Sequence, residues 1–186
     1  MHGDVVVISY PSCITTGMID GFDDLLDRCD KIGVPVHIDG AWFGQCRNVV
    51  LDVSHPAIKT VSVSLSKAFG MGSQRIGIRY SRERNVGPIS IMNDFDYANV
   101  SDMWIGVNMM ETLGADYWWK TYGALYSKVC TDFGLTEANS IHVAWHQRDD
   151  NIVALGIRTP LRMLIEGIFD LRGTDAGLNK IERNER

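Results

Sequence analysis

The amino-acid sequence predicts an α/β protein organised around a mostly parallel β-sheet. Two observations support this prediction. In the first half of the chain, short apolar runs alternate with a helical stretch, and the order strand, helix, strand is typical of parallel sheets. The runs are almost continuously apolar, which indicates strands that are buried on both faces. The 186 residues suffice for one domain, or for one domain and a fraction of a second.

The first strand and the helix after it have clear boundaries. Val5 to Tyr10 is a β-branched apolar run, and a turn-rich break follows from Pro11 to Gly17. Asp20 is suited to cap a helix, and Gly33 fits the position that ends it. The apolar residues of this helix recur on one face: Phe22, Leu25, Leu26, Cys29 and Ile32.

Three further strands follow this helix. They are predicted at Val34 to Ala41, Lys59 to Ser66 and Gln74 to Tyr80. The turn between Lys67 and Gln74 is too short for a helical crossover. The fourth strand is therefore predicted to run antiparallel to the third.

The second half of the chain combines helices with weaker strand patterns. The predicted elements, in order, are helices at Ser101 to Leu113 and Tyr117 to Asp132, strands at Ser140 to His146 and Ile152 to Arg158, and a helix that begins at Pro160. Gly134 is expected to end the second helix. The second helix carries an apolar stripe typical of a core or a dimer interface, made of Trp118, Tyr122, Leu125 and Val129. The helix at Ser101 to Leu113 is expected to be buried because it contains Met103, Trp104, Met109 and Met110.

Composition excludes several classes of function. The net charge of -5 gives no reason to expect nucleic acid or an anionic membrane as a partner. No stretch is long and apolar enough to span a bilayer, and no basic region precedes the first apolar run as in a signal peptide. The four cysteines form no CxxC pair, and no histidine cluster has zinc spacing. We expect a cytoplasmic protein with free thiols and no metal site.

The segment around Lys67 carries the first candidate chemistry. In a strand, alternate residues share a face, so Ser62, Ser64 and Ser66 are predicted to lie together. Lys67 then follows at the carboxyl end of the strand, which is the edge where open α/β sheets bind ligands. Partial desolvation of a lysine at this edge favours its neutral amine, which is a nucleophile.

A second group of residues is expected at the same edge. Asp39 lies near the carboxyl end of the second strand, where a carboxylate is costly without a cationic partner. Gly40 and Ala41 leave flat space beside it that suits a planar ring. Arg75 follows the glycine-containing turn after Lys67, and arginine is the natural bidentate ligand of a phosphate.

These residues, in this order, resemble the fold-type-I family of enzymes that use pyridoxal phosphate (PLP). The resemblance is closest to aminotransferases and covers residues 5 to 80. Ser64-Leu65-Ser66-Lys67, followed by Arg75-Ile76-Gly77, is similar to the segment that carries the Schiff-base lysine in that family.

The resemblance implies a role for each matching residue. Lys67 would bind PLP as a Schiff base and act as the catalytic base, and Asp39 would pair with the protonated pyridine nitrogen. Ala41 would pack against one face of the ring. Trp42 stands where aminotransferases usually carry a tyrosine that contacts the ring hydroxyl. The residues implied in phosphate binding are Ser64, Ser66 and Arg75.

The resemblance also implies a fold and an assembly. It predicts a partial three-layer α/β/α sandwich of the aspartate aminotransferase-like major domain over residues 1–131. Residues 132–186 would form part of an α+β small domain, and the protein would be a homodimer. In the family an arginine of the small domain binds the substrate carboxylate, and Arg158 is the first candidate for it, ahead of Arg162. The long N-terminal region of the family is not matched, so we expect a gene fragment, a truncated homologue or one piece of a split protein.

Three functions remain open at this point. The first is an aminotransferase that moves an amino group between an amino acid and a 2-oxo acid. The second is a PLP-dependent amino-acid decarboxylase. It is favoured by the resemblance of His37-Ile38-Asp39-Gly40-Ala41-Trp42, with Thr15-Thr16-Gly17 before it, to those enzymes. They usually have His-Lys where this chain has Ser66-Lys67. The third is a non-catalytic fragment that assembles with a partner chain.

Overall fold

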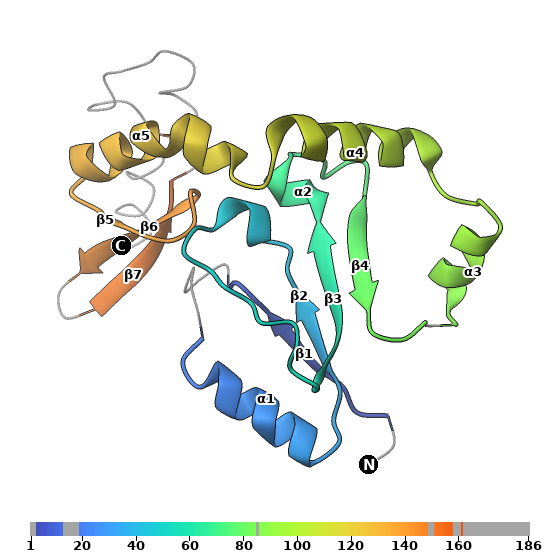
Figure 1. The fold of residues 1–186 in the computed structure, drawn as a ribbon. Helices are drawn as coiled ribbons and strands as arrows, with labels where there is room; N and C mark the ends of the chain where they lie inside the picture. The colour runs from blue at the N-terminus through green and yellow to red at the C-terminus, as the bar shows by residue number, and fades with distance from the viewer. Residues whose placement is uncertain (1–2, 13–18, 85, 149–150, 158–160, 162–186) are drawn as a thin grey trace, which may run out of the picture.

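A four-stranded β-sheet forms the centre of the protein in the computed structural model, which describes residues 3–12, 19–84, 86–148, 151–157 and 161 (Figure 1). The strands lie in the order β1-β2-β3-β4. Their bounds are Val6–Ser9, Val36–Asp39, Ile58–Ser64 and Gly77–Ser81. β1, β2 and β3 are parallel, and β4 pairs with β3 in the antiparallel sense. The predicted α/β class and the reversal of the fourth strand are both confirmed.

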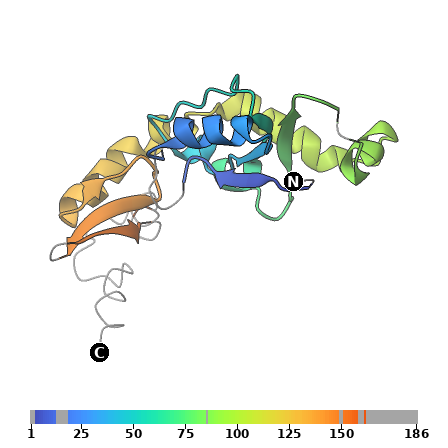
Figure 2. The ribbon, with the colours of Figure 1, turned by 90° about the horizontal axis from the view of Figure 1, so that it is seen from below.

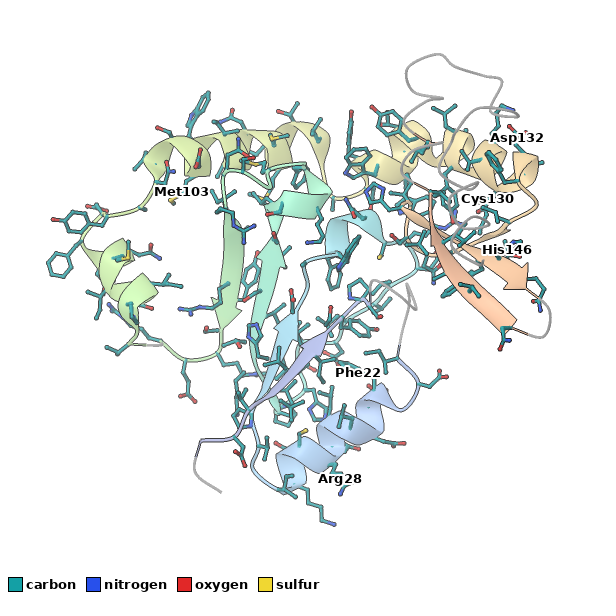
Figure 3. The ribbon with its side chains drawn as sticks, turned by 180° about the vertical axis from the view of Figure 1, so that it is seen from behind. Phe22, Arg28, Met103, Cys130, Asp132 and His146 are labelled. Atoms are coloured by element: carbon teal, nitrogen blue, oxygen red, sulfur yellow. The ribbon has the colours of Figure 1, made fainter. Side chains whose placement is uncertain are left out.

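Helix α1 (Phe22–Lys31) packs on one face of this sheet. Figure 3 shows Phe22 on the side of α1 that points toward the strands and Arg28 on the side that points away. The helix ends at Lys31, and Gly33, two residues further on, has the expected left-handed φ of 70°. Asp20 does not cap it, because the residue that directly precedes the helix is Gly21, with a φ of 71° and no side-chain cap. The core between α1 and the sheet is made of Ile8, Tyr10, Phe22, Leu26, Cys29, Val36, Ile38, Ala57, Ile58 and Val61.

The opposite face of the sheet is polar. Figure 2 shows α1 on one side of the strands, and no described helix lies against the other. Residues in register there form two rows across the strands: Val7, His37, Thr60 and Ser81, then Ser9, Asp39, Ser62 and Arg79. Val7 is 63% exposed. The prediction that the first strand is buried on both faces is therefore wrong for the described residues, since only alternate side chains reach the core.

The third strand is shorter than predicted. It ends at Ser64, and the one-turn helix α2 (Leu65–Ala68) begins directly after it. The Ser64 hydroxyl accepts a hydrogen bond from the Ser66 N–H at 3.1 Å, which starts the helix. Ser66 therefore does not share a strand face with Ser62 and Ser64. The cap side chain turns the chain out of the sheet two residues earlier than the apolar pattern indicates.

The second half of the chain forms helices and a small antiparallel sheet. The helices are α3 (Pro88–Asp94), α4 (Val100–Leu113) and α5 (Tyr117–Asp132). The sheet contains β5 (Thr136–Glu137), β6 (Val143–Arg148) and β7 (Asn151–Gly156). The predicted bounds of α5 are confirmed, and α3 was not predicted. The helix expected from Pro160 lies outside the described residues. No described helix has the length and apolar character needed to cross a membrane.

α5 supplies the core of the second half, as its apolar stripe predicts. Tyr126 and Val129 are fully buried, and Trp118, Tyr122 and Leu125 pack around them. Figure 3 shows Cys130 on the side of α5 that faces the small sheet. Burial raises the pKa of the Cys130 thiol.

α4 is not the buried helix that its methionines and tryptophan suggest. Met103 is 48% exposed and Trp104 is 67% exposed. Gly106 is the one residue of α4 that is fully buried, and it lies against Leu65. Met109 and Met110 are half-buried, so α4 covers the rest of the described chain only with part of its apolar surface.

Replacing Tyr126 with phenylalanine is expected to destabilise the protein by about 1–3 kcal/mol. Its buried hydroxyl donates to the Val143 carbonyl at 2.9 Å and accepts from the Ala138 N–H at 2.6 Å. Removing the hydroxyl leaves the Val143 carbonyl and the Ala138 N–H without this hydrogen-bond partner. Urea denaturation measures the change. Tyr80→Phe is the matched control, because Tyr80 is 60% exposed; equal stability of Tyr126→Phe and Tyr80→Phe would contradict the assignment.

Candidate active site

The carboxyl ends of β2 and β3 bring the main candidate residues to one edge of the sheet. Asp39 is the last residue of β2, and Trp42 follows it within three residues. Ser64 is the last residue of β3, and Lys67 lies in α2 directly after it. β2 and β3 are parallel neighbours, so their carboxyl ends and the segments that follow them lie at the same edge of the sheet, where α/β sheets bind ligands (Figure 1).

Lys67 and Trp42 are in contact across this edge. The Lys67 Nζ lies 5.2 Å from the centroid of the Trp42 ring, which is a cation–π distance. Both residues are partly buried. The amine therefore stands beside a flat aromatic surface rather than in open solvent.

Asp39 is held by the backbone at the end of β2. Its Oδ1 accepts a hydrogen bond from the Ala41 N–H at 3.1 Å. Between them, the Gly40 N–H donates to the Ser62 carbonyl at 2.7 Å. A Cβ at position 40 would lie 3.1 Å from that carbonyl oxygen, so glycine allows the tight turn that directs Asp39.

The serines and Arg75 occupy different positions around this edge. Ser64 Oγ accepts from the Ser66 N–H and keeps its own hydrogen as a donor. Arg75 is exposed and has a left-handed φ of 55°. It lines an apolar cavity of about 470 Å³ between β4, α3 and α4, and Lys67 is not among the residues that line it. The structure thus brings Lys67, Trp42 and Asp39 to one edge, but it directs Arg75 to a neighbouring surface.

Some candidates lie outside the described residues. These are Arg158, Arg162 and Thr15 to Gly17. Among the residues that are described, no group of three or more His, Cys, Asp and Glu side chains could hold a metal ion.

Sequence reasoning missed Gln45 and a second role of the tryptophans of α5. Gln45 ends the short 3-10 helix η1 (Phe43–Gln45) and is 3% exposed. Its Nε2 donates to the Lys67 carbonyl, and the Trp118 Nε1 donates to the Ala68 carbonyl. A buried indole N–H needs an acceptor. The tryptophan in the apolar stripe of α5 indicated that an indole N–H would need an acceptor. The sequence does not indicate which carbonyl that acceptor is.

An ion pair joins the segment after η1 to the small sheet. Arg47 lies 2.5 Å from Glu137 and 4.2 Å from the centroid of the Trp119 ring. Hydrogen bonds from Ser127 and then from Arg47 hold the pKa of the Glu137 carboxyl below its usual range. These contacts fix α5 beside the candidate site.

Comparison with known proteins identifies the fold. No protein-family model and no curated protein sequence matches the chain. Three similar solved structures are a probable N-succinyldiaminopimelate aminotransferase from Thermus thermophilus, a C-S lyase from Staphylococcus hominis and a putative kynurenine aminotransferase from Saccharomyces cerevisiae. The sequence identities are 15%, 10% and 13%, and the TM-scores are 0.57, 0.61 and 0.53. The C-S lyase structure contains PLP.

The matched regions differ in extent between this chain and the solved structures. The matches cover 89%, 89% and 76% of this chain, and 57%, 53% and 38% of the respective solved chains. The chain therefore has the fold of part of these enzymes. The predicted aminotransferase-like fold is confirmed, and the similarity to a C-S lyase was not predicted.

Proposed function

We propose that the protein is a PLP-dependent transferase of the aminotransferase type, which moves an amino group between an amino acid and a 2-oxo acid. The observation that carries this proposal is the position of the Lys67 amine. It lies against the Trp42 indole at the sheet edge that also carries Asp39. The fold shared with aminotransferases agrees with it.

The residues at this edge fit the chemistry of PLP. An amine can bond to the aldehyde carbon, a carboxylate can pair with a protonated pyridine nitrogen, and an indole offers a flat apolar surface to the ring. In this proposal the three groups are Lys67, Asp39 and Trp42, with Ala41 beside the ring. When bound, PLP supplies an electron sink for negative charge at the substrate α-carbon.

The phosphate group is assigned to the serines and Arg75. Ser64 Oγ retains a hydrogen to donate to a phosphate oxygen while it caps α2. Ser66 lies in the same turn. Arg75 is the available guanidinium, and its flexible side chain would have to turn from the α4 cavity toward the α2 turn.

Lys67 has two tasks in the reaction. Its amine would hold the cofactor in the resting enzyme, and the neutral amine would accept the proton from the substrate α-carbon. The Trp42 indole excludes water from one side of this amine. Arg158 is proposed to bind the substrate carboxylate.

Replacing Asp39 with asparagine is expected to lower the rate of amino-group transfer about 100-fold, because asparagine cannot stabilise a cationic pyridine ring as a carboxylate does. Attachment of PLP to Lys67 should persist, since the amine is unchanged. Steady-state kinetics and a mass spectrum after borohydride reduction measure the two effects. The control is Asp30→Asn, which changes an exposed carboxylate of α1. A rate equal to that of the wild type would contradict the assignment of Asp39 as the partner of the pyridine nitrogen.

The decarboxylase remains the second candidate. The segment from His37 to Trp42 favours it by resemblance, and the two reactions break different bonds at the same carbon. The chain is incubated with PLP, a set of amino acids and a 2-oxo acid acceptor, and both 2-oxo acid and carbon dioxide are quantified. Release of 2-oxo acid without carbon dioxide supports the transferase. Carbon dioxide as the main product would replace the transferase with the decarboxylase.

Assembly into a homodimer, or with another partner chain, is part of the proposal. Its support is the exposed apolar surface on α3, α4 and the segment between them. There Phe95 is 70% exposed, Tyr97 is 75% exposed and Trp104 is 67% exposed. Surfaces of this kind are typical of protein–protein contacts.

A further inference from the structure

The helix that carries Lys67 is too short to be stable by itself. α2 has four residues, and a single turn of helix gains too few hydrogen bonds to offset the entropy of forming it. Local support comes from the Ser64 cap and from the Leu65 carbonyl, which accepts from the Phe69 N–H at 3.0 Å. The position of Lys67 must therefore depend on other elements.

Two side chains from distant segments bind the end of this helix. The Gln45 Nε2 donates to the Lys67 carbonyl, and the Trp118 Nε1 donates to the Ala68 carbonyl. Carbonyls at a helix end have no partner within the helix and ordinarily bind water or a cap. Here both are held by protein donors, from η1 and from α5.

These donors are themselves fixed. The Gln45 carbonyl accepts from the Trp119 Nε1 and from the Ile141 N–H, both at 3.1 Å. A Cβ at Gly44 would lie 2.4 Å from the Ala68 Cβ, so η1 and α2 are in the closest possible contact. The backbone of Lys67 is thus tied to η1 and, through two consecutive tryptophans, to α5.

If the Gln45 side chain only filled space, an apolar side chain of the same size would be more stable at this position. Its side chain is 3% exposed, and its Oε1 is buried with no hydrogen-bond partner among the described residues. An unsatisfied buried acceptor is destabilising, and an apolar residue of the same size would avoid it. The Nε2 bond to Lys67 is an interaction that an apolar residue could not make.

We propose that Gln45 and Trp118 are positioning residues for Lys67, a role that rests on the proposed function. By holding the last two carbonyls of α2, they keep the Lys67 amine over the Trp42 ring, at the sheet edge that also carries Asp39. Neither residue touches the reacting atoms. Loss of either bond lets the turn open and moves the amine away from the cofactor.

The test compares Gln45→Leu and Trp118→Phe with the wild type in the full chain. Leucine keeps most of the volume of glutamine and phenylalanine keeps an aromatic ring, but neither can donate the bond. Trp104→Phe is the matched control, because Trp104 lies exposed on α4. Two quantities are measured: amide hydrogen exchange of the peptide that contains residues 65–71, and the rate of borohydride-trapped PLP attachment to Lys67.

Both variants are expected to exchange about tenfold faster over residues 65–71 and to attach PLP about tenfold more slowly, as loss of one buried hydrogen bond predicts. Hydrogen exchange in α1 should be the same in both variants as in the wild type. The Trp104→Phe control should match the wild type in both quantities. If Gln45→Leu fails to fold, the exchange and PLP attachment of Trp118→Phe alone test the proposal. Unchanged exchange, or unchanged attachment in a variant whose exchange is faster, overturns the proposal. Absence of attachment in the wild type instead rejects the proposed function, and exchange then decides whether these residues hold the turn.

Discussion

Replacing Lys67 with alanine is expected to abolish attachment of PLP and to lower amino-group transfer by about 1,000-fold. Under the proposed function, the variant would lose both the nucleophile that holds the cofactor and the base that moves the α-proton. The mutated side chain is only partly buried and its amine makes a cation–π contact with Trp42, so the fold should persist. Product formation and absorbance of bound PLP measure the effect.

The control for this variant is Lys59→Ala. Lys59 is an exposed lysine on the same strand that leads to Lys67, near the opposite end. It should keep wild-type activity and wild-type PLP attachment. Activity of Lys67→Ala within a factor of about three of the Lys59 control would contradict the assignment of the base.

The second large effect is expected from Gly44→Ala. The added methyl group would lie 2.4 Å from the Ala68 Cβ, far below the 3.5–4.0 Å at which carbon atoms pack. Neither carbon can rotate away, so η1 must move from α2 and carry Gln45 with it. Overpacking of this kind costs about 1–3 kcal/mol of stability, and attachment of PLP to Lys67 should fall with it.

A double variant makes this prediction specific. Adding Ala68→Gly removes the methyl group that causes the clash, so the pair Gly44→Ala and Ala68→Gly should recover part of the lost stability. Gly72→Ala is the control, because no atom lies within 4 Å of a Cβ at that position. Urea denaturation measures all three variants. A double variant no more stable than Gly44→Ala would show that this contact does not limit the packing of α2.

The local sequence was sufficient to predict the four strands of the sheet and the edge at which Asp39 and Lys67 lie. Continuous apolar runs indicated β1, β2 and β3, and the length of the turn after Lys67 indicated the antiparallel direction of β4. The edge that carries Asp39 and Lys67 followed from the strand direction alone. These features depend on residues that are close in the chain or on rules of sheet topology.

The features that were missed depend on contacts between distant residues. Gln45 and Trp118 lie 22 and 50 positions from the carbonyls that they bind, and no local pattern indicates such partners. The exposure of α4 was missed for a similar reason. Its apolar residues indicate that something covers the helix, but composition does not say whether the cover belongs to the same chain. The Ser64 cap, which ends β3 and starts α2, is a local feature, but the apolar alternation that continues to Ser66 favoured a longer strand.

Arg75 illustrates how a sequence match and a geometry can differ. Its spacing from Lys67 fits the resemblance to the aminotransferase segment, but its left-handed backbone directs it to the surface beside α4. Its role in phosphate binding therefore remains a prediction from sequence. Lys67, Trp42 and Asp39, in contrast, are placed at one edge by the fold itself.

Identifying the residue that PLP modifies tests the assignment of Lys67 as the residue that binds the cofactor. The purified 186-residue chain is incubated with PLP and reduced with borohydride, and its folded state is checked by circular dichroism. Digestion and mass spectrometry then locate the pyridoxyl group. One pyridoxyl group per chain is expected on Lys67, with only background label on exposed lysines such as Lys59. A folded chain with no label on Lys67, or with label spread evenly over its lysines, would contradict it.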